Sequence, residues 1–143
     1  MISELYERIA EYESDISKEE EELQTDKDNY YSLKDFKGVE ESSHDDVHNI
    51  LVSKNKALNQ LEQYCEHNEV INSYEKGTNS ILSKLGYIRV AMMFDFLGLS
   101  IDAKLLEYEA SIALHKIKIG SYKLCISSLY DEIREEEERE DDA

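Results

Sequence analysis

The sequence predicts an all-α protein, either an elongated helical hairpin or a four-helix bundle. Three observations support this fold class. The chain has no proline and only five glycines in 143 residues, so few positions force a helix to end. Charged residues make up 34% of it, as is common in long helices. Apolar residues recur at alternating spacings of three and four near both ends, the pattern of a helix that packs along another helix.

The most regular spacing lies in residues 101–133, where His115 alone interrupts an apolar row. The row consists of Ile101, Leu105, Tyr108, Ile112, Ile119, Tyr122, Ile126, Leu129 and Ile133. We predict a helix about 50 Å long here. A second row, wide enough to need another neighbouring helix, consists of Leu106, Ala110, Ala113, Ile117 and Leu124.

A similar row begins the chain and predicts a helix that ends at Gly38. The row consists of Ile2, Leu5, Ile9, Tyr12, Ile16, Leu23, Tyr30 and Leu33. Glu19 and Asp26 occupy two further positions of the same spacing. Polar residues at such positions weaken packing but can select a register or a partner.

The middle of the chain is less regular. We predict a loop over residues 40–46, a helix over 47–65 that continues weakly to Tyr74, and a break at Gly77. An apolar helix over 81–97 then ends at Gly98, and Ser100 caps the long helix. A continuous helix through Gly98 is the alternative, because glycine costs only about 1 kcal/mol inside a helix. We expect the side chains of 81–97 to lie in a core, with a docking surface as the alternative.

The net charge of the chain limits the classes of molecule that it is expected to bind. The net charge is −17, which argues against binding nucleic acid or an anionic membrane surface. No stretch is long and apolar enough to cross a bilayer, and the opening residues do not resemble a signal peptide. We therefore expect a cytoplasmic protein with one domain over residues 1–138. Residues 139–143 are expected to form a disordered acidic tail.

Few residues are candidates for catalysis or metal binding. Cys65 and Cys125 are predicted to be reduced, partly buried thiols. His44 and His48 have the spacing of a helical metal pair, but they lie where we expect a helix to start, and we predict no metal site. His115 is predicted to be a packing residue. We identify no catalytic residue and no cofactor, and predict that the protein is not an enzyme.

Two segments carry a family resemblance. Residues 5–16 open with a Leu-aromatic-x-x-Ile run and continue as a charged helix, and residues 118–129 look like a second long helix. In these respects the chain resembles the small, WXG-like α-helical partner proteins encoded with LXG toxins of Gram-positive type VII secretion. The family's Trp-x-Gly turn is missing, because the chain has no tryptophan.

The resemblance implies a targeting or chaperone partner that docks on the helical N-terminal domain of a secreted toxin and is exported with it. It also implies an aromatic-x-x-x-acid export motif, which Tyr31 and Asp35 match, as do Phe36 and Glu40.

Two other functions remain open from the sequence. Residues 4–28 and 131–142 are densely acidic, which fits an inhibitor that mimics nucleic acid, of the anti-CRISPR or anti-restriction type. The long rows also fit a structural homodimeric coiled coil. For a docking protein, we predict partner binding first through adaptable apolar side chains and then through the first row. The first set is Met92, Met93 and Phe96, and the second is Tyr12, Ile16 and Leu23.

Overall fold

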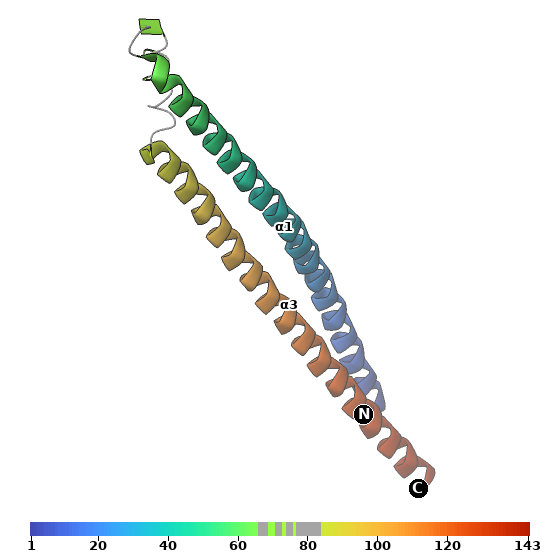
Figure 1. The fold of residues 1–143 in the computed structure, drawn as a ribbon. Helices are drawn as coiled ribbons and strands as arrows, with labels where there is room; N and C mark the ends of the chain where they lie inside the picture. Colours follow the sequence, from blue (N-terminus) through green and yellow to red (C-terminus); the bar gives the residue numbers. More distant parts are fainter. Residues whose placement is uncertain (66–68, 71–72, 74–75, 77–83) are drawn as a thin grey trace. The chain divides into compact units, whose positions relative to one another are not determined.

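The computed structural model describes residues 1–65, 69, 70, 73, 76 and 84–143. It is all-α, with helix α1 over Ile2–Cys65 and helix α3 over Lys84–Asp141 (Figure 1). The predicted fold class is thus confirmed at the level of all-α, and α3 includes the whole predicted helix over 101–129. The four-helix bundle is not confirmed. Neither described helix carries an apolar stretch sufficient to span a bilayer.

Helix α1 passes through Gly38 and the expected loop over 40–46 without interruption, so both of these predictions are wrong. A glycine that ends a helix usually adopts a left-handed conformation, and no described glycine has a positive φ. On α1 the inward-facing positions keep the alternating spacing of three and four beyond Leu33, but several of them are polar residues. The less exposed positions after Leu33 include five with this spacing: Lys37, Glu40, His44, Val47 and Leu51.

Helix α3 likewise continues through Gly98, so the predicted stop is wrong and the continuous alternative is correct. Ser100 does not cap a helix; its hydroxyl donates to the Phe96 carbonyl oxygen one turn earlier, at 2.9 Å. Helix α3 also includes residues 139–141, which the sequence assigns to a disordered tail. The predicted break at Gly77 and the weak helix near Tyr74 lie outside the described residues.

The chain divides into two compact units. Unit 1 contains Met1–Ser32 and Leu105–Ala143, and unit 2 contains Leu33–Lys104. Within each unit α1 and α3 run antiparallel, because contacts pair rising numbers on α1 with falling numbers on α3. In unit 1 these contacts are Tyr12 with Tyr122, Glu19 with His115 and Tyr30 with Glu109. In unit 2 they are Lys37 with Asp102, His44 with Phe94 and His48 with Tyr87.

The core of unit 1 is formed by the two predicted rows. Leu5, Ile9, Leu129 and Ile133 form a buried cluster against which Ile2, Tyr12 and Ile126 pack. No described side chain is less than 2% exposed, because two helices alone enclose little volume. Cys125 is a free, half-buried thiol, as predicted, whereas the side chain of Cys65 is not described.

Other apolar side chains are left exposed by the residues that the structure describes. In unit 1 the second row of α3 is open to solvent, with Leu106 65%, Ile117 68% and Leu124 74% exposed. In unit 2 the expectation that the side chains of residues 81–97 lie in a core is wrong for Met92, Met93 and Phe96, which are 64%, 72% and 74% exposed. The core prediction fails here because α1 covers only one side of a helix that is apolar on several sides.

The continuity of α1 can be tested with Gly38→Ala. An added Cβ at this position meets nothing within 4 Å, and alanine is the better helix former. We expect the free energy of unfolding to rise by about 0.5–1 kcal/mol, measured by urea unfolding followed by circular dichroism. A fall of similar size would contradict the continuous helix, because it would mean that Gly38 ends a helix in a left-handed conformation.

Candidate functional site

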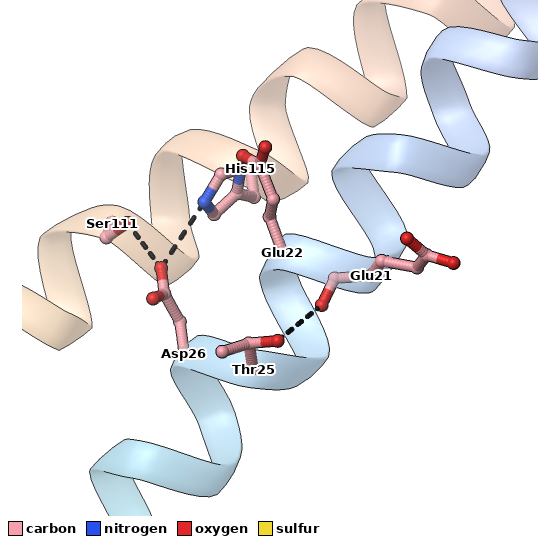
Figure 2. A pocket seen from close by; sticks show the side chains of 6 residues that line it. All are labelled: Glu21, Glu22, Thr25, Asp26, Ser111 and His115. Atoms are coloured by element: carbon pink, nitrogen blue, oxygen red, sulfur yellow. Dashed lines mark hydrogen bonds and ion pairs between the residues drawn. The ribbon is translucent and has the colours of Figure 1, made fainter.

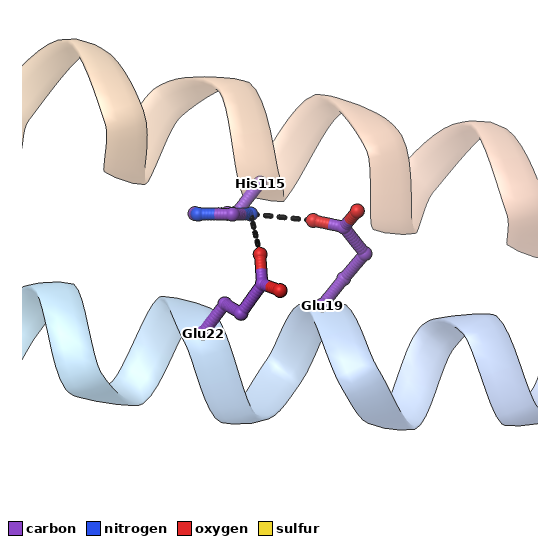
Figure 3. Close-up of side chains that lie close together, drawn as sticks. All are labelled: Glu19, Glu22 and His115. Carbon is purple, nitrogen blue, oxygen red and sulfur yellow. Dashed lines mark hydrogen bonds and ion pairs between the residues drawn. The ribbon is translucent and has the colours of Figure 1, made fainter.

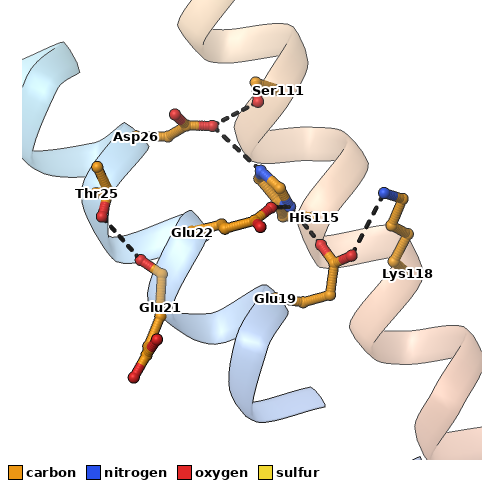
Figure 4. A network of polar contacts seen from close by, with 8 residues as sticks. All are labelled: Glu19, Glu21, Glu22, Thr25, Asp26, Ser111, His115 and Lys118. Carbon is orange, nitrogen blue, oxygen red and sulfur yellow. Dashed lines mark hydrogen bonds and ion pairs between the residues drawn. The ribbon is translucent and has the colours of Figure 1, made fainter. Parts of the chain in front are cut away.

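The candidate site is a polar layer inside unit 1. The three residues that interrupt the two apolar rows, Glu19 and Asp26 on α1 and His115 on α3, lie together between the paired helices (Figure 4). The sequence shows each of them as an exception to its own row. It does not show that they meet, because the pairing register of the two helices is a tertiary property.

Both nitrogens of the His115 ring face carboxylates. The Nδ1 atom is hydrogen-bonded to Glu19 Oε2, and the Nε2 atom lies 3.3 Å from Asp26 Oδ2 (Figure 4). The His115 side chain is 10% exposed, so water competes little for these contacts. A histidine placed between two carboxylates in this way has an acceptor group beside each of its ring nitrogens.

Two further residues of α3 satisfy the same carboxylates. The Ser111 hydroxyl donates to Asp26 Oδ2, and Lys118 Nζ donates to Glu19 Oε1 at 3.3 Å. Hydrogen bonding to His115 is the main cause that lowers the pKa of Glu19 below its ordinary value. Burial opposes this shift, and the Lys118 ammonium adds to it. The layer is thus an ionic contact across two helices.

Some residues of the polar layer are also possible metal ligands. Glu19, Glu22 and His115 place one ligand atom each within 4.8 Å of one another (Figure 3). The Glu22 carboxylate lies 3.8 Å from His115 Nδ1, and an open hollow beside it is lined by Glu21, Thr25 and Ser111 (Figure 2). However, Nδ1 is already bonded to Glu19, so an ion would have to replace that contact. The expectation that no metal is bound stays a prediction.

What the layer can do is select a register. A shift of α1 by one heptad in either direction would place a carboxylate opposite an apolar position of α3 and leave it without the imidazole. Such a carboxylate would lose water without gaining a partner, which is unfavourable. Within unit 1 the layer therefore favours the observed pairing over its nearest alternatives.

Unit 2 has polar contacts of its own. Lys37 forms an ion pair with Asp102, and this contact is the main cause that raises the Lys37 pKa. The His44 ring stacks on Phe94 with centroids 4.8 Å apart, whereas His48 Nδ1 lies 2.8 Å from the Tyr87 hydroxyl. The two histidines of the discounted metal pair thus contact different aromatic side chains.

The other predicted site residues fall into two groups. Tyr12, Ile16 and Leu23 are half-buried within unit 1, and Tyr12 packs against its core. Met92, Met93 and Phe96 are on the surface of unit 2.

The export-motif candidates differ in accessibility. Tyr31 and Asp35 are both exposed. In the alternative pair, Phe36 is exposed but Glu40 is only 7% exposed, with its carboxylate near Gly98. Exposure therefore favours the first pair.

Comparisons with known proteins were made with protein-family models, with curated proteins and with solved structures, and none of the three found a match.

The polar layer can be tested by removing the imidazole. We expect His115→Ala to lower the melting temperature by several degrees, because two half-buried carboxylates lose their shared partner. The matched control replaces all three residues, as Glu19→Leu/Asp26→Leu/His115→Leu, and should be at least as stable as the wild type. An unchanged melting temperature in His115→Ala would contradict a stabilising role for the contact.

The pH dependence of unit 1 follows from Glu19. A pKa that is lower in the folded state means that the carboxylate stabilises the fold above its ordinary value of 4.5 and loses this effect as pH falls through the folded pKa. We expect Glu19→Gln to lose less stability than the wild type between neutral pH and about pH 3. Thermal unfolding at each pH measures this, and Glu20→Gln, at an exposed position of α1, is the control. Parallel pH profiles of wild type and Glu19→Gln would rule the effect out.

Proposed function

We propose that this chain is a non-enzymatic helical interaction protein, a targeting or chaperone partner that docks on the helices of a larger protein. The supporting observation is the patch formed by Met92, Met93 and Phe96 on α3 of unit 2, which we call the Met/Phe patch. Three large apolar side chains that are mostly exposed and adjacent on one helix are typical of a binding surface. Methionine and phenylalanine also adapt to the shape of a partner and are enriched in interfaces.

The arrangement of unit 2 explains why the patch is open. Phe94, which lies between Met93 and Phe96 in the chain, turns toward α1 and stacks on His44. The side of α3 that contacts α1 is therefore occupied by Phe94, and the Met/Phe patch lies on other sides of the helix. A partner helix laid against these sides would bury the patch without disturbing the contact between α1 and α3.

The resemblance to partners of LXG toxins suggests the form of the larger protein. In that form the chain is an elongated helical hairpin that is made in the cytoplasm, stacks on the helical N-terminal domain of a toxin and is exported with it. Tyr31 and Asp35, both exposed, would be available to the export machinery. The neighbouring gene should then encode a protein with a long helical N-terminal domain, and its product is the binding partner to use.

The proposal predicts the behaviour of Met93→Ser/Phe96→Ser. Because both side chains are mostly exposed, the double variant should keep the melting temperature of the wild type to within a few degrees. Its affinity for the product of the neighbouring gene, measured by isothermal titration, should fall by about tenfold or more, as expected for lost interface anchors. Apolar docking should also persist above about 0.3 M salt, where a mimic of nucleic acid would lose its target.

The matched control is Val39→Ser/Ile50→Ser, which changes apolar side chains of unit 2 that are 61% and 58% exposed on α1. It should bind as the wild type does. Equal loss of affinity in both variants would contradict a specific role of the Met/Phe patch. Outright unfolding of Met93→Ser/Phe96→Ser would show that its residues belong to a core.

A further inference from the structure

A second apolar surface lies in unit 1, on the side of α3 that faces away from α1. His115, Ile119 and Tyr122 lie toward α1, so positions two or five residues along the helix lie on the opposite side. Six residues at alternating spacings of four and three occupy it, and we call them the outer row: Leu106, Ala110, Ala113, Ile117, Gly120 and Leu124. The three large members are each at least 65% exposed, and none of the six is charged.

The outward side of α1 in the same unit is different. Glu7, Glu21 and Asp28 recur there at multiples of seven and are all exposed. Water and counterions solvate such a side, and burying it would cost free energy. Unit 1 therefore has one solvated side, on α1, and one apolar side, on α3.

The order of large and small residues in the outer row makes it complementary to itself. If a second copy approaches with its α3 antiparallel and the two-fold axis near residue 115, Leu106 lies opposite Leu124 of the second copy. The same operation places Ala110 opposite Gly120 and Ala113 opposite Ile117. A two-fold axis repeats every such contact, so the six positions form six layers. The small residues allow the two backbones to approach closely, as in other tightly packed helix pairs.

Charge decides between antiparallel and parallel arrangements. The antiparallel arrangement places Glu109 beside Lys123 of the second copy, twice, at the edge of the row. A parallel arrangement places neither residue beside an opposite charge. Lys116 meets Lys116 of the second copy near the axis, and both side chains are exposed and long enough to diverge.

The charge of the whole chain, −17, opposes self-association, but the segment that carries the outer row is not acidic. Residues 106–124 carry Glu107 and Glu109 against Lys116, Lys118 and Lys123, so this segment is slightly positive. The acidic residues 4–28 belong to α1, on the other side of unit 1, and the acidic residues 131–142 follow the outer row at the end of α3. At physiological salt the screening length is about 8 Å, which weakens repulsion between distant acidic sides.

We infer that a second copy of this chain covers the outer row, with the two α3 helices antiparallel and Glu109 of each copy beside Lys123 of the other. The inference concerns unit 1 and is independent of the Met/Phe patch in unit 2. It gives the protein a self-association surface that is separate from the proposed docking surface.

The first test measures mass. Under reducing conditions and at 0.15 M salt, sedimentation equilibrium should show a concentration-dependent rise from 16.6 kDa toward twice that value. Leu106→Gln/Ile117→Gln/Leu124→Gln should stay at 16.6 kDa at every concentration, with an unchanged circular dichroism spectrum. The matched control, Val39→Gln/Ile50→Gln/Val52→Gln, alters exposed apolar residues of α1 and should dimerise as the wild type does.

The second test determines the arrangement. Lys123→Glu alone should raise the Kd of the dimer by about tenfold, because two attractive pairs become repulsive. Glu109→Lys should do the same, and Glu109→Lys/Lys123→Glu should restore the Kd to within about threefold. Glu109 accepts a hydrogen bond from the Tyr30 hydroxyl at 3.2 Å, so the melting temperature of each variant is measured as well.

Three results would overturn the inference. A wild-type chain that stays monomeric at all concentrations would do so. So would a dimer that survives the three Gln replacements in the outer row. Charge reversals that leave Kd unchanged, or that are not restored in the double variant, would rule out the antiparallel arrangement. Each of these results leaves the binding of the neighbouring gene product through unit 2 unaffected, so the two proposals fail separately.

Discussion

The structure depends on one geometrical constraint: among the described residues of each unit, α1 and α3 pair only with each other. A pair of helices buries one row of side chains on each, and everything outside those rows remains in contact with water. The core of unit 1 is accordingly narrow, with Leu5, Ile9, Leu129 and Ile133 at its centre. Apolar residues beyond the rows, such as Ile117 and Phe96, are exposed for the same reason and not because packing failed. A chain built in this way leaves apolar side chains exposed, and the proposed contacts with partners use them.

The polar layer favours one pairing register of the two helices in unit 1. A row of similar apolar side chains repeats every heptad, so several registers have comparable packing. Glu19, Asp26 and His115 break this degeneracy because both carboxylates meet the imidazole in only one register. The polar layer contributes more to the choice of register than to the free energy of unfolding, since an apolar layer of similar volume could pack as well. Both carboxylates are held by α3 residues besides the imidazole, which makes the layer complete.

The distribution of charge is consistent with this division of roles. On α1 of unit 1 the outward positions are acidic and solvated, whereas the outward positions of α3 over residues 106–124 are apolar or small, with lysines beside them. Charged residues keep one side of a helix free of unwanted contacts, and an uncharged row on the other side permits close approach. The acidic outward positions of α1 in unit 1 thus mark a side on which no helix is expected to dock.

The sequence by itself determined the all-α class, the two apolar rows and their polar exceptions, because the spacing of side chains along a helix is a local property. It did not determine where helices end. Gly38, Gly98 and the polar residues 40–46 are typical of breaks, yet pairing with the opposite helix maintains the helical conformation through them. Only the tertiary structure decided that Glu19 and Asp26 meet His115, and that Phe94 turns inward while Phe96 does not. These outcomes depend on the register between segments about 50 to 100 residues apart, and no local pattern encodes that register.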